Sequence, residues 1–113
     1  MSDVVRIETP HSYSSAVRAG EYVFIGLHRG FGDTFQEQIR NTFLSLEETL
    51  RKFSLSLTNI VKIHVWLKDI NDLPVMEKEF RDYFEEATFP ARMTSTTDFI
   101  DSDCLIMIEG TAY

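Results

Sequence analysis

Cysteine is nearly absent from this chain of 113 residues, and Cys104 alone cannot form a disulfide within the chain. Nothing therefore points to an oxidising compartment, and we expect the cytoplasm. The sequence also lacks any apolar run near the ~20 residues that a membrane-spanning helix needs. Its first residues show no basic stretch followed by an apolar one, which a secretory signal would have. We expect a protein that is neither exported nor embedded in a membrane.

Basic residues are also scarce, since 18 acidic residues against 11 basic ones give a formal charge of -7. Such a charge repels nucleic acid and anionic lipid, and no basic and aromatic residues interleave as in RNA-binding modules, so no nucleic-acid partner is expected. The histidines, His11, His28 and His64, lack the spacing of metal ligands. The glycines from Gly26 to Gly32 match no phosphate-binding or dinucleotide-binding motif and are expected to form turns. No metal and no cofactor is expected.

The remaining pattern predicts a single domain over residues 1–113 that begins with strands. A short strand at 4–7 is followed by a hairpin, with strands at 15–18 and 22–27 and a turn at Ala19-Gly20-Glu21. The spacing of Thr34 and Glu37 is that of a capping box, which predicts a helix start. The apolar residues that follow at steps of three and four predict one buried stripe: Phe35, Ile39, Phe43, Leu46, Leu50 and Phe53.

Alternation predicts a strand at 60–67, with Val61, Ile63, Val65 and Leu67 on one face and Lys62, His64 and Trp66 on the other. Pro74 suits the first turn of a second helix running to about Phe84, with an apolar stripe of Leu73, Met76, Phe80 and Tyr83 or Phe84. Strands follow at 92–97 and 104–112, joined by a turn at Asp101-Ser102-Asp103. The order β-β-β-α-β-α-β-β predicts an α+β fold with a mixed sheet and two helices on one face, each strand-helix-strand step giving parallel neighbours. The other face would be exposed, which predicts oligomerisation.

Two residues in these last strands are candidates for chemistry. Pro90 fixes the approach to Arg92, whose guanidinium could bind a carboxylate near the start of a strand; the alternative is a solvated surface arginine. Glu109 interrupts an apolar strand, so it is either exposed, paired or perturbed for acid-base work. Cys104 has no catalytic partners around it and is interpreted as a small buried hydrophobe.

Four segments together resemble the Rid/YjgF (reactive intermediate deaminase) family, also labelled endoribonuclease L-PSP. Residues Ile60–Asp72 are similar to the family block Val-Val-Lys-x-x-Val-Phe-Leu-Lys-Asp-Met-Asn-Asp. Residues Phe89–Arg92 reproduce its Phe-Pro-Ala-Arg motif, and Ile108–Ala112 resemble its Ile-Glu-Ala-x-Ala ending. Residues Tyr13–Val17 resemble the opening Pro-Tyr-Ser-Gln-Ala-Val. The resemblance covers essentially the whole chain.

The resemblance implies a chorismate-mutase-like homotrimer, with three sheets forming a central barrel, helices outside and active sites between subunits. In deaminating members an arginine binds the substrate carboxylate, and a tyrosine, a serine, an asparagine and a glutamate line the pocket. The glutamate orients water onto an imine carbon. Enamines such as 2-aminoacrylate are thereby converted to 2-keto acids and ammonia without a cofactor. The partners implied are two further copies of the chain and a small carboxylate-bearing metabolite.

Only part of that pocket is present. Arg92 and Tyr13 match, but the family's Ser-Gly-Gln is replaced by Gly26-Leu27-His28, and its asparagine falls near Glu77. The glutamate credited with activating water aligns with Met107, which cannot move a proton. Glu109, on the same strand face as Met107, or Glu77 or His28 from the opposite wall, could supply a base. The substrate-binding candidates are Arg92, Tyr13, Gly26, Met107 and Thr94, and the catalytic candidates are Glu109 and Glu77.

Three functions follow from the resemblance. The first is hydrolytic deamination of enamines and imines, with Arg92 as the anchor. The second is a non-catalytic sensor or scavenger that binds a 2-keto acid or similar carboxylate, and Met107 favours it. The third is endoribonuclease activity, against which the acidic charge and the lack of a catalytic histidine pair argue.

Overall fold

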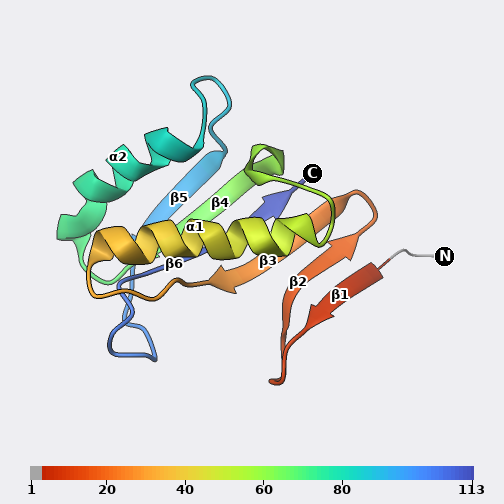
Figure 1. The fold of residues 1–113 in the computed structure, drawn as a ribbon, viewed down its shortest axis with the longest axis horizontal. Coiled ribbons are helices and arrows are strands. Elements are labelled where there is room, and N and C mark those ends of the chain that lie inside the picture. Colours follow the sequence, from red (N-terminus) through yellow and green to blue (C-terminus); the bar gives the residue numbers. More distant parts are fainter. Residues whose placement is uncertain (1–3) are drawn as a thin grey trace.

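The computed structural model describes residues 4–113 as one six-stranded sheet with two long helices. Figure 1 shows both helices on the same side of the sheet. The elements, in chain order, are β1 (Val4–Glu8), β2 (Ser14–Ala19), β3 (Tyr22–His28), α1 (Phe35–Arg51), the short 3-10 helix η1 (Leu57–Asn59), β4 (Ile60–Leu67), the 3-10 helix η2 (Ile70–Asp72), α2 (Leu73–Tyr83), β5 (Ala91–Thr96) and β6 (Ile106–Ala112). The predicted order of strands and helices is confirmed.

The sheet order is β1-β2-β3-β6-β4-β5, and only β4 and β5 are parallel neighbours. The expectation that each strand-helix-strand step joins parallel neighbours is therefore right for β4-α2-β5 and wrong for β3-α1-β4. The reason is that β6 returns antiparallel to both β3 and β4 and hydrogen-bonds to each of them. The last strand, with no helix to follow it, completes the centre of the sheet.

Helix α1 begins as its sequence predicts. The Thr34 hydroxyl accepts a hydrogen bond from the Glu37 N–H at 3.1 Å, and the Glu37 carboxylate accepts one from the Thr34 N–H at 3.1 Å. These two bonds satisfy N–H groups that have no partner in the first turn. The predicted stripe from Phe35 to Phe53 is buried along its whole length, with its members at most 9% exposed. Packing of that stripe on the sheet supplies the main core.

Strand β4 departs from simple alternation at its start. Ile63, Val65 and Leu67 are buried as expected, but Val61 is 47% exposed and Ile60 is buried in its place. The pairing with β6 shifts register between Ile60 and Lys62, so β4 has one extra residue there relative to β6. Such a bulge reverses which side chains point to the core, so that Ile60 and not Val61 faces it. The prediction that Val61 belongs to the core face is wrong for this reason.

Helix α2 ends at Tyr83, close to the predicted end. It contacts α1 through aromatic stacking and through a buried carboxylate. The Phe43 ring of α1 stacks on Tyr83 with centroids 4.1 Å apart. Glu79 is buried, and its carboxylate accepts hydrogen bonds from Gln36 at 2.9 Å and from Arg40 at 3.1 Å. Burial raises the pKa of Glu79, but these hydrogen bonds and the Arg40 charge outweigh it and hold the pKa below its ordinary value. The carboxylate therefore stays charged while it joins the helices.

Two predicted features of the connecting segments are corrected. Gly26 lies inside β3, not in the loop beyond it. The last strand begins at Ile106 rather than at Cys104, because the Cys104 N–H donates to the Asp101 carbonyl at 3.1 Å in a turn. Cys104 itself is buried, as interpreted from the sequence, and burial raises the pKa of its thiol.

The face of the sheet opposite the helices is uncovered in the single chain, as predicted. Trp66, Met107 and Glu109 on that face are only half-buried. Large apolar side chains nearby are more exposed, among them Phe24 at 50% and Met93 at 60%. Neither helix in the described part of the chain has the length and apolarity needed to cross a membrane.

Candidate functional site

Arg92 lies near the start of β5 and points to the side of the sheet that carries the helices. Its place follows from register, because β5 runs parallel to β4 with Arg92 beside the buried Ile63. The guanidinium carbon lies 4.9 Å from the centroid of the Phe80 ring on α2. One terminal nitrogen of Arg92 donates to the carboxylate of Glu77, which lies one turn before Phe80 on α2. The predicted guanidinium at the head of a strand is thus present, but it is already paired with a carboxylate of its own chain.

A cavity of about 250 Å³ opens between α2 and the start of β5. It is lined by Glu77, Phe80, Arg81, Phe89, Pro90 and Arg92. The lining contains two guanidinium groups, one carboxylate and two aromatic rings. A small anion could therefore meet positive charge and flat apolar surface together.

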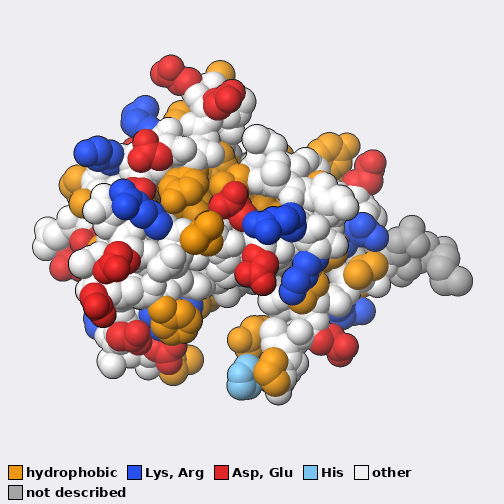
Figure 2. Space-filling view, in the orientation of Figure 1, with side chains coloured by type: hydrophobic (Ala, Val, Ile, Leu, Met, Phe, Trp, Pro, Cys, Tyr) orange, Lys and Arg blue, Asp and Glu red, His pale blue; other side chains and the backbone are white. Residues whose placement is uncertain are grey.

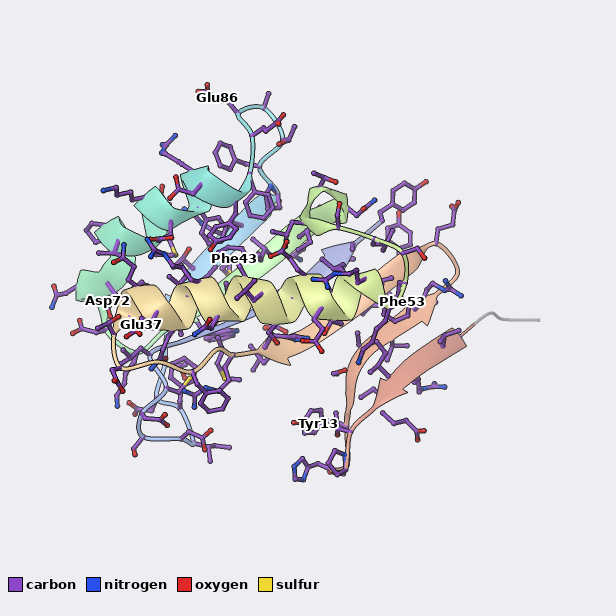
Figure 3. All side chains as sticks on the ribbon, in the orientation of Figure 1. Tyr13, Glu37, Phe43, Phe53, Asp72 and Glu86 are labelled. Atoms are coloured by element: carbon purple, nitrogen blue, oxygen red, sulfur yellow. The ribbon has the colours of Figure 1, made fainter. Side chains whose placement is uncertain are left out.

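Tyr13 lies in a different place, at the tip of the β1–β2 hairpin. Figure 3 shows its ring projecting toward the gap beneath α1, and Figure 2 shows a notch between this tip and the rest of the molecule. The notch contains a cavity of about 260 Å³, lined by Thr9, Tyr13, Ser15, Leu27, His28, Arg29, Ser45, Glu48, Thr49 and Lys52. Tyr13 is 61% exposed, so much of its ring remains free for contact with a ligand or another chain.

His28 lines that second cavity, and Gly26 contacts it from two residues earlier on β3. His28 is buried, and its Nδ1 lies 2.7 Å from the Gly26 carbonyl while its Nε2 lies 2.7 Å from the Thr49 hydroxyl. A carbonyl can only accept, so Nδ1 carries the proton, and Nε2 accepts from Thr49. Burial lowers the pKa of His28, against the raising effect of the Gly26 hydrogen bond. Both ring nitrogens are occupied, which leaves no free lone pair for a general base.

Glu109 and Met107 occupy a third place, on the uncovered face of the sheet. The Trp66 indole N–H donates to the Glu109 carboxylate at 2.9 Å. The His64 ring stacks on Trp66, with centroids 4.0 Å apart, and its Nε2 lies 3.2 Å from the Ser95 hydroxyl. Because this face is opposite the one that holds Arg92, neither Glu109 nor Met107 reaches the Arg92 cavity of the same chain.

The predicted site residues thus fall into three groups. Arg92 and Glu77 are brought into contact, and Thr94 lies on the same face of β5, beside Val65 of β4. Tyr13 and Gly26 belong to the region beneath α1, and Met107 and Glu109 to the uncovered face. Sequence reasoning missed Arg81, Phe80 and Phe89 as cavity residues. Their signal was the spacing of three and four residues from Glu77 on a predicted helix, together with the aromatic ring directly before Pro90.

Within residues 4–113 no three side chains of the metal-binding types come together in a way that could hold an ion. The groups able to act on a ligand in the Arg92 cavity are therefore the two arginines and Glu77. The two guanidinium groups are hydrogen-bond donors only, whereas the Glu77 carboxylate is an acceptor. The cavity therefore combines two cationic groups suited to an anion with one carboxylate that can accept a proton from a ligand or water.

Comparison with known proteins agrees with this architecture. The family model described as Endoribonuclease L-PSP matches residues 4–113. A RutC family protein of Pyrococcus horikoshii is 31% identical over 109 residues, which span 89% of this chain and 86% of that protein. The human protein named 2-iminobutanoate/2-iminopropanoate deaminase is 28% identical over 108 residues, 88% of this chain and 78% of its own length.

Solved structures share the fold. A YjgF family protein of Neisseria meningitidis superposes with a TM-score of 0.92 at 21% identity, over 97% of this chain and 93% of that chain. The RidA protein of an Antarctic Psychrobacter species superposes with a TM-score of 0.86 at 25% identity, over 96% and 93%. Since the family model spans residues 4–113 and the P. horikoshii relative aligns with most of the chain, this chain belongs to the endoribonuclease L-PSP family, also called the Rid/YjgF family.

Proposed function

We propose that this chain binds small 2-imino and 2-keto carboxylates in the Arg92 cavity and hydrolyses the imines to 2-keto acids and ammonia without a cofactor. The observation that carries the proposal is the contact between Arg92 and Glu77 in one small cavity. A fixed cation and a proton acceptor are the two groups that this hydrolysis needs. The name of the human relative, an imine deaminase, supports the same reaction class.

Arg92 would hold the substrate carboxylate. A guanidinium presents five N–H donors in a planar fork, and Glu77 occupies one terminal nitrogen only. Within residues 4–113 the other donors of Arg92 have no acceptor, so they are free to bind a ligand. The Phe80 ring beneath the guanidinium limits its movement, which favours one orientation of the bound carboxylate.

Glu77 would act as the general base. A water oxygen attacks C2 and forms the C–O bond while the C=N electron pair moves to nitrogen. Glu77 accepts the first proton of that water and passes it to the nitrogen, which gives a carbinolamine. Glu77 then accepts the remaining hydroxyl proton and passes it to the amine nitrogen, so that the C–N bond breaks, the carbonyl forms and ammonia leaves. Proton transfer by a positioned side chain typically contributes about 10²- to 10⁴-fold to a rate.

The complete site would lie between subunits of a cytoplasmic homotrimer. The uncovered sheet face, with Phe24, Met93 and half-buried Trp66, is the surface that a second copy would bury. Exposed Tyr13 and nearby Gly26 would then form one wall of the Arg92 cavity of a neighbouring copy. Without that neighbour, Tyr13 and Arg92 serve two separate cavities of about 260 and 250 Å³.

A second candidate is a non-catalytic sensor or scavenger of the same carboxylates. It is favoured by the thioether of Met107 at the position where the family has its usual glutamate, and by the hydrogen bond that ties Glu109 to Trp66. Under this alternative the Arg92–Glu77 pair only tunes affinity, and the bound imine is not hydrolysed.

A turnover and binding measurement on Arg92 variants tests the proposal. The imine formed from freshly generated 2-aminoacrylate is mixed with the protein, and the release of 2-keto acid and ammonia is followed. We expect the wild type to accelerate release, Arg92→Met to lose the acceleration, and Arg92→Lys to weaken 2-oxobutanoate binding by more than about tenfold, because lysine lacks the fork.

The control is Arg51→Met, which removes an exposed arginine at the end of α1 that lies outside the cavity. It should leave both binding and turnover unchanged. No acceleration by the wild type, with binding that still depends on Arg92, would establish the non-catalytic alternative. Binding that is insensitive to Arg92 would refute both.

A further inference from the structure

We propose that Arg81 determines specificity by binding a second carboxylate, so that the preferred ligands are 2-imino and 2-keto acids with a terminal carboxylate. The inference rests on the proposed function, because it assigns the substrate class of the same cavity. It is carried by the charge of Arg81, which forms no ion pair within residues 4–113, by the aromatic ring beside it and by its place in the lining of the same cavity as Arg92.

Arg81 is left without an ion-pair partner within residues 4–113 by the arrangement of α2. Glu77 and Arg81 stand four residues apart with the acid first, which is the favourable order for an ion pair on a helix. Glu77 instead binds Arg92 from the neighbouring strand. Within residues 4–113 Arg81 makes no ion pair and no side-chain hydrogen bond, although acidic residues adjoin it in sequence. Its charge is therefore available to a ligand.

An aromatic ring lies beside the Arg81 guanidinium. The guanidinium carbon lies 6.0 Å from the centroid of Phe89, the residue before Pro90. Arg92 lies in the same way over Phe80, at 4.9 Å. The cavity thus holds two guanidinium groups, each placed against its own ring, and aromatic faces favour such placement of a cation.

The charge of the lining then selects the ligand. Arg81 and Arg92 are opposed by Glu77 alone among the lining residues. A monocarboxylate held by Arg92 would leave Arg81 facing water. A ligand with a carboxylate at each end of a short chain would engage both cations, and a volume of about 250 Å³ suits a metabolite of that size.

Calorimetric titration of the full-length protein with two matched 2-keto acids tests the inference. The probes are 2-oxoglutarate and 2-oxopentanoate, which have the same five-carbon chain and differ in a terminal carboxylate or methyl. We expect the wild type to bind 2-oxoglutarate on the order of tenfold more tightly, which corresponds to about 1.4 kcal/mol. Arg81→Gln should remove this preference by weakening 2-oxoglutarate alone, and Arg81→Lys should restore part of it.

Lys78→Gln is the matched control, because Lys78 is exposed on the same helix, carries the same charge and does not line the cavity. It should leave the preference unchanged. A preference that falls equally in Lys78→Gln would assign the effect to general charge and overturn the inference. Equal binding of the two probes by the wild type, or equal weakening of both in Arg81→Gln, would also overturn it while the proposed function stands. If neither probe nor 2-oxobutanoate binds, the proposed function itself fails.

Discussion

Replacing Glu77 by glutamine separates catalysis from binding more sharply than any other change in the cavity. Glutamine keeps the length and shape of the side chain and can still accept a hydrogen bond from Arg92, but it cannot take up a proton at neutral pH. If Glu77 is the general base, turnover should fall by about 10²- to 10⁴-fold. The affinity for a 2-keto acid should move in the opposite direction.

The size of the affinity change follows from the exposure of the ion pair. The side chains of Arg92 and Glu77 are 28% and 42% exposed, so water screens their attraction. Partly exposed pairs contribute about 0.2–1 kcal/mol. Removing the competing carboxylate should therefore leave the dissociation constant unchanged or lower it by up to about fivefold.

The assay is release of 2-keto acid and ammonia from a freshly generated imine, together with calorimetric titration of 2-oxobutanoate. Glu86→Gln is the control, since it removes an equal charge from the loop after α2, and Figure 3 shows Glu86 at the tip of that loop, away from the body of the protein. Turnover within twofold of wild type in Glu77→Gln would refute the role of base. A more than tenfold loss of affinity would instead show that Glu77 holds Arg92 in place.

Two further predictions concern the scaffold. Gly30→Ala should destabilise the protein by about 1–3 kcal/mol or more in urea unfolding, because a Cβ there would lie 2.3 Å from the backbone nitrogen of Thr42; a loss below about 0.5 kcal/mol would contradict the packing. Burial lowers the pKa of His28 from its usual 6.5, so below about pH 6.5 the unfolded chain binds a proton that the folded chain does not. The stability that neutral His28 contributes is therefore present above about pH 6.5 and is lost as the pH falls below it. The melting temperature of the wild type should therefore fall more than that of His28→Gln between about pH 7.5 and about pH 5.5, and equal falls would refute this reading.

Local patterns in the sequence were enough to predict most elements of the fold. The capping box at Thr34 and the stripe of α1 depend on spacing of a few residues, and both are present. The position of β6 between β3 and β4 was not predictable in this way. It depends on hydrogen bonds between strands far apart in the chain, and the local pattern of apolar residues does not predict such pairings. The exchange of Ile60 and Val61 at the start of β4 has the same origin, in the register with β6.

The candidate site was predictable in its residues and not in its contacts. Arg92 and Glu77 could both be named from motifs, since each is matched to a position of the family pattern. That they touch depends on the packing of α2 against β5, and that Glu109 lies on the other face depends on the alternation of β6 beside β4. Arg81 was overlooked because an arginine on a helix surface carries no motif of its own.

The family, the order of helices and strands, and the arginine at the head of β5 follow from the amino-acid sequence alone. Which charges meet depends on the folded arrangement of α2 and β5. Helix propensity and strand alternation act over a few residues, so they can be predicted from the sequence. The pairing of Glu77 with Arg92 in preference to Arg81 is a competition between residues of different elements, which only folding brings together. That competition leaves Arg81 unpaired within residues 4–113, and it sets the charge of the cavity.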